Sequence, residues 1–135
     1  MNYPLWDLAF SGSGLIVAII ATIHVFISHF AIGGGIFLWL AEWWSGKQPE
    51  GAEIRKWLHK YATFFLVYTT VFGAMTGVGI WFSIQLASAE GTSLLIHQFV
   101  FVWASEWVLF LAELTVLYLY YYGWKTNSPR MQLWL

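Results

Sequence analysis

The sequence predicts an all-α membrane protein with three long transmembrane helices, followed by a tail or the start of a fourth. Hydrophobic residues make up 59% of its 135 residues and charged residues only 10%, against roughly 25% charged in a typical soluble domain. Ten Trp and eleven Phe add to a mean hydropathy of +0.64, as expected for a chain in lipid. The apolar residues also fall into three runs of about 30 residues, each longer than the ~20 residues that cross a bilayer.

The elements follow in order from these runs. Residues 1–13 mix aromatic side chains with a carboxylate, which predicts a segment lying on the membrane surface. Spans are predicted over 14–44, 57–86 and 94–124, and their length implies that they tilt or project beyond the hydrocarbon core. Residues 125–135 are predicted to form a cytoplasmic tail or the start of the fourth span.

Charge and cysteine content exclude several classes of protein. A formal net charge of −1 does not support a nucleic-acid partner, because proteins that bind nucleic acid carry an excess of basic residues. The chain has no cysteine, which excludes disulfides, iron–sulfur clusters and haem attached through cysteine. No basic residue precedes the first apolar run, so a cleaved signal peptide is not predicted.

The basic residues predict the orientation. All of them fall between the first two spans, just inside the second span, or after the third span. The positive-inside rule then places loop 45–60 and the C-terminal tail in the cytoplasm and the N-terminus outside the cell (inner) membrane, which the chain crosses several times. The six basic residues are Lys47, Arg55, Lys56, Lys60, Lys125 and Arg130.

Polar residues inside the spans indicate a site. Counted at 1.5 Å per residue, His24 lies ~15 Å and Glu106 ~18 Å from the outer ends of their helices, with Gly73, Gly77 and Gly79 at a similar level. This layer suits a haem, which needs an iron ligand and room for a flat ring. It combines an imidazole, a carboxylate and a helix face that carries glycines in place of side chains. The alternative for the glycines is direct helix contact, because Gly73 and Gly77 form a small-xxx-small motif.

Three carboxylates are candidates for moving protons. Glu106 and Glu113 are seven residues apart and share one helix face, and carboxylates in line within a membrane suit a proton relay. The alternative is that each hydrogen-bonds a neighbouring helix. Glu42, at the cytoplasmic end of the first span, is a candidate for taking up protons or an ordinary solvated carboxylate at the interface.

Two further histidines are candidates for additional haem ligands. His29 follows His24 by five residues, about 140° around the helix, so the two cannot face one cavity squarely. His97 lies near the outer surface. For both, the alternative is a histidine satisfied by a local hydrogen bond.

The order and spacing of several residues together resemble a known family, subunit I of the cytochrome bd-type quinol oxidases. The resemblance covers nearly the whole chain but about the first third of the family's subunit. The residues that carry it are His24, Gly33 and Glu42 at intervals of nine; Ser45-Gly46-Lys47-Gln48; Trp57 and Lys60; Gly73-x-x-Thr76-Gly77; Phe82; Glu106 and Glu113; and Gly123-Trp124.

This resemblance implies a four-helix bundle that holds an oxygen-reactive haem of b or d type. His24 matches the axial histidine for haem iron, and Glu106 and Glu113 match carboxylates that deliver protons. It further implies an oxidoreductase of the respiratory chain, acting with the remaining helices or subunits of a bd-like oxidase complex and with quinol or a cytochrome as electron donor. The chain alone would not be a complete quinol oxidase, because the family's other haem ligands lie on later helices.

The sequence departs from the family at several positions. Glu106 and Glu113 stand one residue closer together, Trp81 replaces a polar residue, and His29 and His97 have no counterpart. Two other functions therefore stay open. One is an electron-transfer subunit of a larger respiratory complex with b-type haem, and the other is a proton-coupled transporter subunit.

Overall fold

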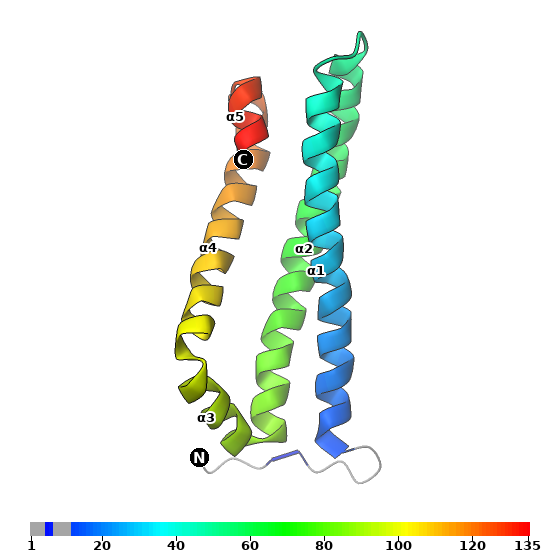
Figure 1. Cartoon of the computed structure of the whole chain (residues 1–135). Coiled ribbons are helices and arrows are strands. Elements are labelled where there is room, and N and C mark those ends of the chain that lie inside the picture. Colours follow the sequence, from blue (N-terminus) through cyan, green and yellow to red (C-terminus); the bar gives the residue numbers. More distant parts are fainter. Residues whose placement is uncertain (1–4, 7–11) are drawn as a thin grey trace.

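The computed structural model describes residues 5–6 and 12–135, and the regular structure in these ranges is helical (Figure 1). Of the predicted surface segment 1–13, only residues 5–6 and 12–13 are described, and the rest of the segment lies outside the described part of the chain. Trp6 is described, and its backbone N–H donates to the Leu86 carbonyl at 2.9 Å. The elements are α1 (Gly12–Ser45), α2 (Gly51–Ala87), α3 (Ala89–Gln98), α4 (Val100–Tyr122), the 3-10 helix η1 (Gly123–Lys125) and α5 (Pro129–Trp134).

Three helical segments are long and apolar enough to cross a membrane: Gly12–Ser45, Gly51–Ala87 and Val100–Lys125. They confirm the predicted all-α membrane protein with three spans. That the helices form part of a haem-binding bundle stays a prediction. The chain reverses direction between successive spans, so the basic residues gather at the end that holds the 46–50 turn and α5 (Figure 1).

The third span differs from its prediction as a single helix over 94–124. The structure divides this region at Phe99, whose backbone (φ −117°, ψ 29°) leaves the helical conformation between α3 and α4. Ser88 starts α3 earlier than predicted, because its hydroxyl accepts the Gly91 N–H at 3.1 Å. The polar residues before Phe99 therefore belong to α3, and the apolar span begins at Val100.

The α1–α2 hairpin forms the core of the molecule. The two helices run antiparallel along their lengths (Figure 1), and their buried residues cluster near the 46–50 turn. Gly34 of α1 lies against the ring of Phe65 on α2. The clustered residues are Leu38, Leu58, Ala62 and Phe65.

By contrast, α4 has no buried residue and stands apart from the hairpin along its middle (Figure 1). Aromatic contacts hold it to α2 at both ends. Trp103 meets Trp81 with ring centroids 6.1 Å apart. At the other end, Tyr121 stacks on His59 at 5.5 Å, and Trp124, just beyond the helix, meets the same imidazole at 5.0 Å.

Candidate functional site

His24 is partly buried in the interface between α1 and α2. Its Nδ1 lies 2.8 Å from the hydroxyl oxygen of Thr76, and that hydroxyl donates its proton to the Phe72 carbonyl at 2.6 Å. A hydroxyl has a single proton, so when Thr76 gives it to the Phe72 carbonyl it accepts at His24, and Nδ1 carries the imidazole proton in that arrangement. Nε2 is then left with a free lone pair, which is the form that binds a metal.

The predicted layer of His24 and glycines exists, but α1 side chains already cover the glycines. A Cβ added to Gly77 would lie 3.3 Å from His24 Cε1, and one added to Gly79 would lie 3.3 Å from Ile20. A Cβ added to Gly73 would lie 3.9 Å from the side chain of Ile27, which also belongs to α1. The three glycines thus serve close helix contact. A haem held by His24 would have to lie beyond the imidazole and not against the glycines.

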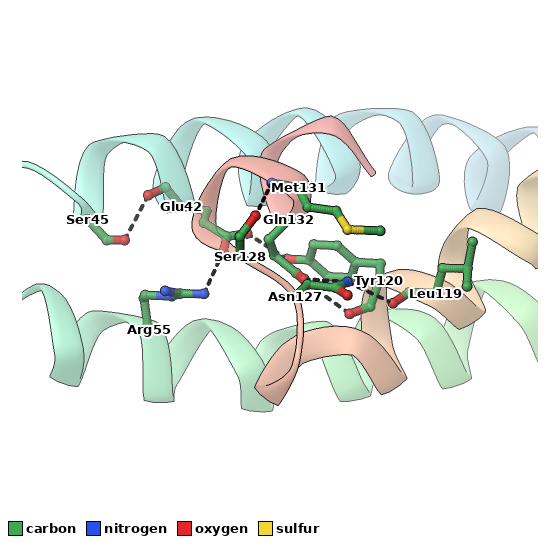
Figure 2. Close-up of polar contacts among 9 residues, drawn as sticks. All are labelled: Glu42, Ser45, Arg55, Leu119, Tyr120, Asn127, Ser128, Met131 and Gln132. Carbon is green, nitrogen blue, oxygen red and sulfur yellow. Dashed lines mark hydrogen bonds and ion pairs between the residues drawn. The ribbon is translucent and has the colours of Figure 1, made fainter.

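Glu42 is only 6% exposed, which contradicts the solvated alternative. Arg55 Nη2 of α2 donates to Glu42 Oε1 at 3.1 Å, and the Tyr120 hydroxyl of α4 donates to Oε2 at 3.3 Å. The Arg55 guanidinium also lies 5.5 Å from the centre of the Trp124 ring. One carboxylate therefore ties three helices together at the basic end (Figure 2).

The segment predicted as a tail or fourth span folds back onto this cluster. Ser128 caps α5 by accepting the Met131 N–H at 3.2 Å. Gln132 is 2% exposed; its Nε2 donates to the Tyr120 carbonyl at 2.9 Å, and its Oε1 accepts from Asn127 at 3.2 Å. Figure 2 shows α5 placed beside Glu42 and Tyr120.

The structure does not bring Glu106 or Glu113 into contact with His24. Both carboxylates are exposed on α4, and within residues 5–6 and 12–135 neither has a hydrogen bond or ion pair. Their position on α4 nonetheless relates them to Tyr120, which lies on the same helix face. Tyr120 follows Glu113 by seven residues, as Glu113 follows Glu106, and seven residues turn a helix by only −20° from two full turns. The face that carries both carboxylates is therefore the face that meets Glu42.

His29 and His97 are exposed and make only local hydrogen bonds. Nδ1 of His29 donates to the Val25 carbonyl at 2.8 Å, and Nδ1 of His97 to the Ser93 carbonyl at 2.7 Å. A carbonyl can only accept, so Nδ1 of each ring is the donor, and Nε2 of each ring makes no hydrogen bond in the described part of the chain. The described ranges contain no group of three or more His, Cys, Asp or Glu placed to hold a metal ion together.

Sequence reasoning missed the role of Arg55, Tyr120 and Gln132. In the sequence, Arg55 indicates only the orientation of the chain, as one of the basic residues. For Tyr120 a signal existed, since its spacing from Glu113 equals the spacing between the two carboxylates.

Comparison of the chain with known protein families, with curated proteins and with solved structures finds no match. What the site can do follows from its own chemistry. It combines an imidazole fixed by a hydroxyl, a buried ion pair and a helix face with two carboxylates.

Proposed function

We propose that the chain is a haem-binding membrane subunit that resembles the oxygen-reactive half of a bd-type oxidase subunit I. In this role it takes part in respiratory electron transfer and in proton delivery to haem. The observation that carries the proposal is the hydrogen bond between His24 Nδ1 and the Thr76 hydroxyl at 2.8 Å. Metal-ligating histidines almost always donate their second ring N–H to an acceptor, a role that Thr76 would have here, and this fixes the ring and leaves Nε2 for the metal.

His24 would hold the iron of a b- or d-type haem, which would supply a one-electron redox centre. The donor fits, because neutral imidazole is a common axial ligand and the ring is held at the apolar α1–α2 interface. The chain would need partners to enclose such a group, since α4 has no buried residue. We infer that these are the remaining helices or subunits of a bd-like complex in the inner membrane, with quinol or a cytochrome as donor.

In this proposal the carboxylates would take up protons and transfer them. Glu42 lies at the basic end, which the positive-inside rule places in the cytoplasm, and would take protons up there. Glu113 and Glu106 share the α4 face that meets Glu42, and they would hold and pass protons toward the haem. An ionised carboxylate within a membrane span is costly, which supports a functional role for both.

Removal of the His24 imidazole tests the proposal. We expect His24→Ala to remove the haem, because alanine offers no ligand atom. The absorption spectrum of the purified complex measures haem content, and Ile23→Ala, an exposed neighbour on α1, is the control for helix substitution. Unchanged haem content in a folded His24→Ala protein would contradict the assignment.

An electron-transfer subunit without oxygen chemistry is the second candidate, favoured by the free Nε2 atoms of His29 and His97. Carbon monoxide separates the two functions, because a haem with ligands on both sides leaves no position for it. Binding to the reduced protein supports the oxidase-like site. A colourless preparation would contradict both and favour a proton-coupled transporter subunit.

Thr76→Val should weaken haem binding while His24 remains. Valine keeps the shape of the side chain but cannot accept the Nδ1 proton, and loss of such an orienting partner typically lowers metal affinity by about 10–100-fold. Haem titration of the stripped protein measures the change. Thr69→Val is the matched control, because the Thr69 hydroxyl also donates to the carbonyl four residues earlier, at 2.8 Å, and has no hydrogen bond to a histidine among the described residues. Equal affinities in the two variants would argue against this role of Thr76.

A further inference from the structure

Tyr120 lies between two carboxylates, Glu42 and Glu113, that are distant from each other in the sequence. Its hydroxyl donates to Glu42 Oε2 at 3.3 Å. Along its own helix, Glu113 lies two turns away on the same face, about 10 Å along the axis. A phenol can accept and donate a hydrogen bond at once, so it can receive a proton on one side and release one on the other.

We propose that Tyr120 is a proton-relay residue that connects Glu42 to Glu113. The inference rests on the proposed function, because it assumes that protons move from the basic end of the protein toward a redox group. It adds a link between the carboxylates, which otherwise have no connection in the described part of the chain.

The transfer step conserves charge on the tyrosine. A proton taken up by Glu42 passes from its carboxyl oxygen to the Tyr120 oxygen, where a new O–H bond forms. The original Tyr120 O–H bond breaks, and its proton passes through water to the Glu113 carboxylate. For this transfer the Tyr120 hydroxyl first turns from Glu42 toward water; Tyr120 is neutral before and after, and the new O–H bond donates to Glu42 as the original one did.

The surrounding contacts hold the tyrosine in place for this step. Gln132 Nε2 donates to the Tyr120 carbonyl at 2.9 Å, and the ring meets Trp124 edge-on with centroids 5.4 Å apart. Arg55 holds the other oxygen of Glu42 at 3.1 Å. These contacts involve the backbone, the ring and the carboxylate, so removal of the hydroxyl alone leaves them intact.

Tyr120→Phe tests the relay in the purified haem complex reconstituted in vesicles. Proton uptake that accompanies haem redox turnover is followed with a pH-sensitive dye by stopped flow. We expect uptake to slow by about 100-fold, the low end for loss of a proton-transfer group, with haem content unchanged. Tyr118→Phe is the matched control, because Tyr118 is 61% exposed on the same helix and no hydrogen bond of its hydroxyl is found in the described residues.

The outcomes separate this inference from the proposed function. Equal uptake rates in Tyr120→Phe and Tyr118→Phe, with haem present, would overturn the relay alone. Wild-type protein without haem would overturn both. A tyrosine with a purely structural role would change thermal stability and leave uptake unaltered. Should Tyr120→Phe fail to fold, Glu42→Gln tests the same link, since an amide cannot carry the proton, and unaltered uptake there would overturn the relay.

Discussion

Arg55→Met is expected to lower the free energy of unfolding by about 3 kcal/mol, the low end of the range for breaking a buried ion pair. Glu42 is 6% exposed, and the substitution would leave its charge without a cation. The low end applies because Arg55 is itself 31% exposed. Chemical unfolding of the protein in detergent, followed by circular dichroism, measures the loss.

Lys56→Met is the matched control, because it removes a cation from the next residue, which is exposed. We expect it to change stability little, since exposed charges contribute about 0–1 kcal/mol. Adding Glu42→Leu to Arg55→Met should restore much of the stability, because apolar residues often replace a buried pair without loss. Equal effects of Arg55→Met and Lys56→Met would contradict the buried pair.

Gly34→Ala should destabilise the α1–α2 hairpin by about 1–3 kcal/mol, the usual cost of overpacking a core. An added Cβ would collide with the edge of the Phe65 ring and lie 2.8 Å from its Cδ2. That ring cannot move freely, because it is buried and packs against Phe30 at 5.7 Å and Tyr61 at 6.1 Å between centroids. Thermal unfolding in detergent measures the effect.

The two neighbouring glycines provide the control for this substitution. A Cβ at Gly33 or Gly35 would have nothing within 4 Å. Alanine is favoured over glycine within a helix by up to about 1 kcal/mol, so Gly33→Ala and Gly35→Ala should be neutral or stabilising. If all three variants behaved alike, close packing at Gly34 would not be the cause.

The haem stays a prediction, and the surroundings of its proposed ligand could be predicted only in part from the sequence. His24 and Gly77 could be placed in one layer by counting residues along helices of known rise, and the structure does place them in contact. Counting could not show that the imidazole itself fills the space over the glycine, because that depends on how closely the helices approach. It also could not identify Thr76 as the partner of Nδ1.

The sequence by itself determined the three apolar spans and the single basic end, because hydropathy, helix rise and charge distribution are properties of continuous segments. Only the tertiary structure decided how Glu42 is paired. Its partners Arg55 and Tyr120 lie 13 and 78 residues away, and they reach it only because the 46–50 turn and the return of α4 bring the three helix ends together. The burial that makes this carboxylate a candidate site is likewise a property of packing, since residues of α2 and α4 close against it.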